Sequence, residues 1–231
     1  MGERLDIVEQ RQRERASRFG EDVRELLQPR GDELALDVGS GLGALAFALA
    51  PHVREVVAVE PDAERVERAL AIAKAERLAN VDFHVGDGRA LGFSDAEFDL
   101  AGTTRTLHHV DRPDLVVAEL ARVTKPGAAL LVVDQLGPDD ADAGARIDEF
   151  EQARDPSHTR ALTDGELRRL FAANGLAVVG SRHVPEHREL EPYLDLAGCS
   201  GPARERARAL APGGEAPDIV VGWYLLRRKR A

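Results

Sequence analysis

Short apolar runs alternate with longer segments of mixed polarity from residue 33 onward. The apolar runs, such as LALDV and AALLVVD, are rich in Val, Leu and Ala and predict buried β-strands. The longer segments carry apolar residues at helical spacing and predict amphipathic helices. We expect strands at 33–38, 54–60, 81–85, 98–103, 128–134, 176–184 and 218–226, and helices at 42–50, 62–78 and 112–123. Such alternation builds βαβ units, so the predicted fold is α/β, a parallel sheet covered by helices on both faces.

Two segments depart from this alternation. Residues 1–30 are strongly charged with apolar positions at helical spacing, and they predict an N-terminal helical cap of one or two helices. This cap could pack on the core, contact another subunit or cover the site as a lid. Within the remaining domain, residues 31–231, a long insertion at about 185–216 separates the last two predicted strands. Connections of this length usually shape a functional site or are disordered.

The stretch LALDVGSGLGALAFALA, residues 34–50, places closely spaced glycines between a predicted strand and a predicted helix. Gly39, Gly41 and Gly43 with the following alanine satisfy the G-x-G-x-x-G/A pattern of dinucleotide-binding turns. Glu60 ends the next strand, where a carboxylate can accept both ribose hydroxyls of an adenosine cofactor. These features predict an adenosine site and leave its cofactor open.

Asp37 lies at the carboxyl end of the first predicted strand, two residues before the first glycine, and is expected to point into the crevice. A carboxylate there would repel the pyrophosphate of NAD. It would favour the sulfonium and ammonium groups of S-adenosylmethionine (SAM). The alternative is that Asp37 caps the helix that begins near residue 42.

Four motifs together resemble the class I SAM-dependent methyltransferases. They are DVGSGLG at 37–43, VVAVEPDAERVERA at 56–69, VDFHVGDGRALGF at 81–93, and the block from 98 to 134. Within this class, the pattern resembles more narrowly the small-molecule branch that includes the ubiquinone and menaquinone C-methyltransferases. It implies a Rossmann-like, doubly wound, seven-stranded sheet that is mostly parallel, with an antiparallel last strand. It also implies SAM as cofactor and S-adenosyl-L-homocysteine as product.

The resemblance assigns a set of residues to the cofactor. Glu60 occupies the ribose-binding position, and Asp87 the position that contacts the adenine amine. The full set is Asp37, Gly39, Ser40, Gly41, Gly43, Glu60, Pro61, Asp87, Gly88 and Thr103. The chain departs from many relatives at Thr103-Thr104-Arg105, so no relative's methyl acceptor is carried over.

His108 and His109 are the candidate catalytic residues. They follow the fourth predicted strand, at the carboxyl edge where α/β proteins place their sites. Either imidazole could accept a proton near neutral pH. A base is needed only where the acceptor must lose a proton, because SAM already carries an activated methyl group. The structural alternative is that the histidines cap the following helix or bond the backbone.

Other polar residues suggest metal sites that we do not expect. His183-Val-Pro-Glu-His187 matches the H-x-x-E-H zinc pattern, but a proline lies inside the helix that this pattern needs. Asp134, Asp139 and Asp140 could suggest a metal-dependent methyltransferase; Asp134 is expected instead to be a pocket wall or a hydrogen-bond acceptor. Cys199 is expected to be a small apolar residue of the late insertion.

Composition and net charge limit the classes of molecule that the protein is expected to bind. With 31 Lys and Arg against 41 Asp and Glu, the net charge of −10 argues against nucleic acid and anionic membranes. The single cysteine fits a reducing compartment, and no apolar run is long enough to span a bilayer. We therefore expect a cytoplasmic methyltransferase acting on a small molecule, with a second copy of the chain as a candidate partner. The alternatives are an NAD-linked oxidoreductase and a non-catalytic SAM-binding protein.

Overall fold

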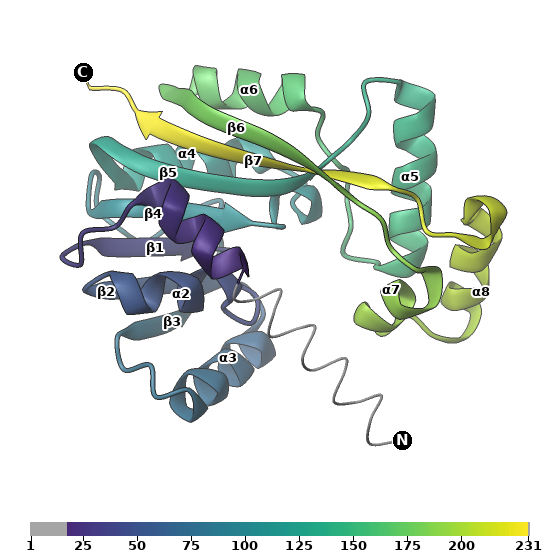
Figure 1. Ribbon diagram of the computed structural model, residues 1–231, viewed down its shortest axis with the longest axis horizontal. Coiled ribbons are helices and arrows are strands. Elements are labelled where there is room, and N and C mark those ends of the chain that lie inside the picture. The colour runs from purple at the N-terminus through teal and green to yellow at the C-terminus, as the bar shows by residue number, and fades with distance from the viewer. Residues whose placement is uncertain (1–17, 231) are drawn as a thin grey trace.

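A single seven-stranded sheet forms the centre of the molecule (Figure 1). The computed structural model describes residues 18–230. The strands are β1 (Leu34–Val38), β2 (Glu55–Glu60), β3 (Val81–Val85), β4 (Phe98–Thr104), β5 (Thr124–Leu136), β6 (Leu176–Glu186) and β7 (Ile219–Arg228). Their order is β3-β2-β1-β4-β5-β7-β6. The pairs among β1 to β5 are parallel, whereas β7 runs antiparallel to both β5 and β6. The predicted sheet, with its antiparallel last strand, is confirmed.

Helices cover both faces of the sheet. The helices are α2 (Ala44–Leu49), α3 (Ala63–Ala75), α4 (Pro113–Val123), α5 (Ala141–Arg154), α6 (Asp164–Ala173), α7 (Leu190–Leu196) and α8 (Gly201–Leu210). One face packs apolar side chains of α4 and α6 against the strands, and the other packs those of α2 and α3. Because both faces of the central strands are buried, most residues of β1 and β4 are buried, as is every residue of β5 from Ala129 to Leu136.

Local sequence signals set the helix ends. Asp62 accepts hydrogen bonds from the backbone N–H groups of Glu64 and Arg65 and so caps α3. A reciprocal capping box between Thr163 and Glu166 begins α6. These caps satisfy N–H groups that the first turn of a helix leaves without intrahelical partners.

The predicted strand at 128–134 is longer in the structure, because β5 begins at Thr124 directly after α4. Thr124 pairs with Phe98 of β4, and the register then shifts so that Ala129 pairs with Leu100. Pro126 and Gly127 lie in this irregular part of the strand, where Gly127 has φ of 82°. An irregularity there accommodates a proline, which cannot donate to the ladder, and a glycine at positive φ.

The helices α5, α7 and α8 gather beyond one end of the sheet (Figure 1). They share a small apolar cluster of their own that includes Phe150, Tyr193 and Cys199. Cys199 is buried there, as predicted. The predicted insertion at 185–216 thus contains α7 and α8, and these lie at the carboxyl edge of the parallel strands.

The predicted N-terminal cap is described only from residue 18. Residues 18–27 form a helix, whose Val23 and Leu27 are buried against the same face of the sheet as α2. The ring of Phe19 lies 5.5 Å from that of Trp223 on β7. This part of the cap packs on the core. The segment proposed as a lid, Glu3 to Phe19, lies almost wholly outside the described residues.

Candidate functional site

The glycine loop lies where the strand order reverses, between β1 and β4. Ligand sites of open α/β sheets form at such a switch point, beyond the carboxyl ends of the strands. The backbone N–H groups of Gly39 and Ser40 both donate to the Val59 carbonyl, at 2.8 and 3.1 Å. Glu60 accepts from the Gly41 N–H at 2.9 Å. The end of β2 therefore fixes the course of the loop.

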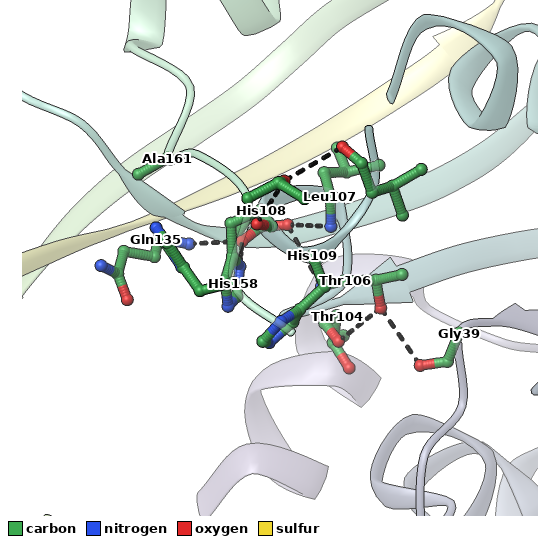
Figure 2. Close-up of polar contacts among 12 residues, drawn as sticks. Gly39, Thr104, Thr106, Leu107, His108, His109, Gln135, His158 and Ala161 are labelled. Carbon is green, nitrogen blue, oxygen red and sulfur yellow. Dashed lines mark hydrogen bonds and ion pairs between the residues drawn. The ribbon is translucent and has the colours of Figure 1, made fainter. Parts of the chain in front are cut away.

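Thr106 fastens the other side of the loop. Its hydroxyl lies 3.1 Å from the Gly39 carbonyl and 3.0 Å from the Thr104 carbonyl (Figure 2). Gly39 has φ of 70°, and a Cβ added there would lie 2.2 Å from the Thr106 methyl group. Only glycine meets both conditions. Thr106 is not predicted by the sequence, since this contact joins residues 67 positions apart.

Asp37 is completely buried, and it does not line the cavity at the loop. Its Oδ2 accepts from the backbone N–H of Ala46 at 3.0 Å, in the first turn of α2. Its Oδ1 is buried without a hydrogen-bond partner among the described residues. Burial raises the pKa of Asp37 to about 7. The expectation that Asp37 points into the crevice is wrong, because the carboxyl group caps the neighbouring helix from beneath the loop.

A cavity of about 220 Å³ opens at the loop and is lined by predicted residues together with unpredicted ones. Its lining residues are Val38, Gly39, Pro61, Asp87, Gly88, Arg89, Thr106, His109, Val110, Asp111 and Val116. A Cβ added to Gly88 would lie 2.6 Å from the Val38 side chain, so glycine keeps the backbone close to β1. The structure thus brings Gly39, Pro61, Asp87 and Gly88 together with His109.

Asp87 is held in an ion pair at the cavity. Arg89 contacts it through Nε and Nη2 at 3.0 and 2.8 Å and reaches Asp111 at 2.6 Å. The hydrogen bonds from Arg89 lower the pKa of Asp87, so it is ionised at neutral pH. An ionised carboxylate can accept a hydrogen bond from an N–H group such as that of the adenine amine.

Three other predicted cofactor residues, Ser40, Gly43 and Thr103, do not line the cavity. Ser40 and Thr103 are buried, and neither hydroxyl has a hydrogen-bond partner among residues 18–230. A Cβ at Gly43 would lie 2.8 Å from the Phe83 ring. The close packing of Gly43 against that ring brings the start of α2 onto the sheet.

His108 forms a buried pair with Asp134. Its Nδ1 donates to Oδ1 of Asp134. The same carboxylate accepts from the backbone N–H of Gln135 at Oδ1 and from that of Leu107 at Oδ2, each at 2.7 Å. Burial alone would raise the pKa of Asp134, but the attraction of His108 and the donated hydrogen bonds lower it. Asp134 is thus a hydrogen-bond acceptor, as predicted. Since His108 is almost wholly buried, this pair fixes the segment that follows β4.

His109 faces the cavity and bonds a residue far along the chain. Its Nδ1 lies 2.9 Å from the hydroxyl of Ser157, which lies 2.7 Å from Asp155. Burial and the neighbouring His108 lower the pKa of His109 to about 4. His109 is therefore neutral at neutral pH. Figure 2 shows its ring beside those of His108 and His158.

The other candidate metal residues are engaged elsewhere. His183 lies on β6 and contacts Asp164 at 3.1 Å, whereas His187 contacts Asp218 at 2.8 Å. Asp140 caps α5 through the Ala143 N–H. Within residues 18–230, no group of three or more His, Cys, Asp or Glu is arranged to hold a metal ion. In the same part of the chain, no helix is long and apolar enough to cross a membrane.

Residues 36–132, which include the loop and both histidines, match the family described as methyltransferase domain. The methyltransferase YcgJ of Bacillus subtilis, itself uncharacterised, is 34% identical over 161 residues, which are 68% of this chain and 64% of YcgJ. The YcgJ crystal structure superposes with a TM-score of 0.81 at 24% identity, covering 92% of this chain and 98% of that one. Residues 36–132 of this chain belong to the methyltransferase domain family. The family uses SAM, which decides between the two predicted cofactors in favour of SAM.

Two further methyltransferases are similar. The ubiquinone/menaquinone biosynthesis C-methyltransferase UbiE of Rubrivivax gelatinosus is 30% identical over 106 residues, 46% of this chain and 41% of UbiE. The geranyl diphosphate C-methyltransferase of Streptomyces coelicolor, solved with S-adenosyl-L-homocysteine, has a TM-score of 0.70 at 16% identity, covering 92% and 80% of the two chains. The sequence matches cover less than two-thirds of the length of YcgJ and of UbiE.

The residues of this methyltransferase fit the cofactor of its family. Neither Gly39, after β1, nor Gly88, after β3, has room for a side chain, so backbone groups border the cavity directly. Asp87 is an ionised hydrogen-bond acceptor at the cavity. The carboxylate of Glu60, which precedes the cavity-lining Pro61, accepts from Gly41 and has further lone pairs that can accept hydrogen bonds. Adenosine offers an amine and two ribose hydroxyls to such acceptors.

Proposed function

We propose that this methyltransferase transfers a methyl group from SAM to a small-molecule acceptor. The observation that carries the proposal is the cavity, which is lined by Gly39 of the glycine loop, by Asp87 and by His109. His109 is neutral there, because its pKa is lowered. SAM, when bound, supplies a methyl group on a positively charged sulfur, so the transfer needs no metal or strong base. The protein's task is to orient the acceptor and exclude water.

The cofactor residues act in two groups in this proposal. Gly39, Pro61, Asp87 and Gly88 line the cavity and contact the cofactor, and Glu60 accepts its ribose hydroxyls. Asp37, Gly41 and Gly43 keep the loop in shape through α2 and the sheet, and Ser40 does so through its backbone N–H, which donates to Val59. Thr103 is buried within β4. His108 acts with the second group, because its pair with Asp134 holds the backbone beside the cavity.

A small acceptor is supported by three observations. The chain is acidic, which disfavours nucleic acid. UbiE and the geranyl diphosphate enzyme are named for small acceptors. The helices α5, α7 and α8 lie beyond the carboxyl ends of the parallel strands, which is the end of the sheet where the site forms (Figure 1).

Binding and turnover test the proposal separately. Isothermal titration should show binding of S-adenosylhomocysteine and none of NAD. Mass spectrometry of a metabolite mixture incubated with SAM should show products heavier by one CH₂ group. Binding without any such product would support the non-catalytic alternative, and binding of NAD alone would overturn the proposal.

A variant pair locates the cofactor. Glu60→Gln should weaken S-adenosylhomocysteine binding by about 1–3 kcal/mol, the scale of a lost hydrogen bond to a charged group. Glu55→Gln, an exposed position on the same strand, is the matched control and should leave the affinity unchanged. Equal affinities for the two variants would show that Glu60 does not contact the cofactor.

A further inference from the structure

The hydroxyl of Ser157 lies between His109 and Asp155, at 2.9 Å from the ring Nδ1 and 2.7 Å from the carboxylate Oδ1. Burial would raise the pKa of Asp155, but the hydrogen bonds from Ser157 outweigh it and lower the pKa, so this carboxylate is ionised at neutral pH. An ionised carboxylate can only accept, and a hydroxyl carries one proton. Ser157 therefore donates to Asp155 and accepts from the Nδ1–H of His109.

This arrangement determines which ring nitrogen of His109 carries no proton. A neutral imidazole carries one proton, and a proton on Nδ1 leaves a lone pair on Nε2. His109 is neutral at neutral pH because its pKa is lowered to about 4. Within the described residues, its Nε2 makes no hydrogen bond, and the side chain lines the cavity. The lone pair on Nε2 is thus available to a bound molecule.

The backbone around Ser157 fixes this geometry. The Ser157 N–H donates to Asp155 at 3.0 Å and closes a tight turn after α5. Two residues later, the N–H and hydroxyl of Thr159 both donate to the His108 carbonyl at 2.8 Å. The turn is therefore joined to the residue next to His109, and the relative position of the two side chains does not depend on their own contact alone.

We propose that Ser157 and Asp155 are positioning residues that hold His109 in its Nδ1-protonated form, which makes Nε2 the proton-accepting atom of the site. The inference rests on the proposed methyl transfer and narrows its acceptors to molecules whose nucleophilic atom bears a proton. The new bond forms between that atom and the methyl carbon, while the carbon–sulfur bond breaks and leaves its electron pair on sulfur. The acceptor's proton passes to Nε2, and His109 then releases it to solvent.

Several charged groups surround His109 and bear on its titration. His108 precedes it, Asp134 lies on β5, and Asp155 and His158 lie on the segment after α5. Asp87, Arg89 and Asp111 share the cavity with it. The acidic Asp134 and Asp155 raise the pKa of His109. Burial and the neighbouring His108 lower it by more, so the net effect is a lowered pKa.

Nitrogen NMR of the cofactor-free protein tests the inference without relying on activity. In the wild-type protein at neutral pH, His109 should show a protonated Nδ1 and an unprotonated Nε2. Ser157→Thr keeps the hydroxyl and should preserve this pattern. Ser157→Ala and Asp155→Asn should shift His109 toward the Nε2-protonated form, whereas His52, which lies outside the cavity, should not change.

Addition of S-adenosylhomocysteine provides a second measurement. It should shift the Nε2 signal of His109 and leave that of His52 in place. A wild-type His109 that carries its proton on Nε2, or a Ser157→Ala spectrum identical to the wild type, would overturn the inference even if methyl transfer is confirmed. Conversely, if the spectra are as expected but no methyl transfer is detected, the proposed function is rejected. The assignment of Ser157 and Asp155 as residues that hold His109 in its Nδ1-protonated form would then still stand. Thermal unfolding and the His158 signal show whether each variant is folded.

Discussion

Asp37 illustrates how one residue can serve the site without contacting it. Its carboxyl group is completely buried, has one hydrogen bond to Ala46 and leaves Oδ1 without a partner among the described residues. Its pKa is raised to about 7 because burial disfavours the charged form. The folded protein therefore keeps a proton that the unfolded chain releases above about pH 4.

Replacing Asp37 should change how stability depends on pH. Between about pH 4 and pH 7 the contribution of Asp37 to the free energy of unfolding should fall as pH rises, since its carboxyl group is protonated in the folded state and ionised in the unfolded chain there, at up to about 1.4 kcal/mol per pH unit. Asp37→Asn should remove this contribution and be the more stable protein above about pH 7. Urea unfolding at about pH 5 and about pH 8 measures the difference. The exposed Asp32→Asn is the control, and parallel pH dependence of wild type and Asp37→Asn would contradict the buried, raised-pKa carboxyl.

At the scale of elements, the position of α2 against the sheet sets the shape of the glycine loop. A Cβ added to Gly102 of β4 would lie 2.6 Å from the Leu45 side chain of α2 and 3.0 Å from the Leu131 carbonyl of β5. Gly102 also pairs with Asp37 across the sheet. The absence of a side chain at Gly102 therefore lets α2 approach the strands that carry the loop.

Gly102→Ala should lower the free energy of unfolding by about 1–3 kcal/mol, because the added methyl group overpacks this contact. Gly180→Ala on β6 is the matched control. Its Cβ would lie 3.8 Å from the nearest atom, an ordinary contact, so its stability should stay within about 0.5 kcal/mol of wild type. Chemical unfolding of both variants checks this. If the two variants lost equal stability, the contact of Gly102 with α2 would not be the cause.

At the scale of the whole molecule, the helices beyond the sheet are held together by a buried charged group. Glu151 of α5 is fully buried and accepts from the Tyr193 hydroxyl of α7 at 2.8 Å and from Arg154 at 2.9 Å. The guanidinium of Arg154 also lies 4.0 Å from the centre of the Tyr193 ring. The unit therefore depends on a few polar contacts in addition to its small apolar cluster.

Glu151→Gln should loosen this unit selectively. It leaves Arg154 buried without a counter-charge, and breaking a buried pair costs about 3–5 kcal/mol. Hydrogen exchange measured by mass spectrometry should show faster exchange in α7 and α8, with β1 and β4 unchanged. Glu149→Gln is the control on the same helix, since its pair with Arg206 is exposed and such pairs contribute at most about 1 kcal/mol. Uniformly faster exchange across the sheet would show that the unit does not unfold separately.

The sequence by itself determined the elements and the loop. Strand and helix periodicity are local, so Val81–Val85 was predicted to the residue and most other elements within two residues of their observed ends. The glycines, Glu60 and Asp87 were found because the loop and strand ends carry them at characteristic spacings along the chain. The start of β5 was placed four residues late, since Pro126 and Gly127 ordinarily end a strand and here are accommodated by an irregularity in pairing.

Only the tertiary structure decided how the site is assembled. His108 meets Asp134 across 26 positions of the chain, and His109 meets Ser157 across 48. No local pattern predicts such pairs, because they depend on how α5 and the following turn pack against the end of β4. Whether Asp37 faces the cavity or the helix likewise depends on side-chain packing within the sheet. The sequence indicated the glycine loop, and the fold placed His109 at the same cavity and brought Ser157 against it.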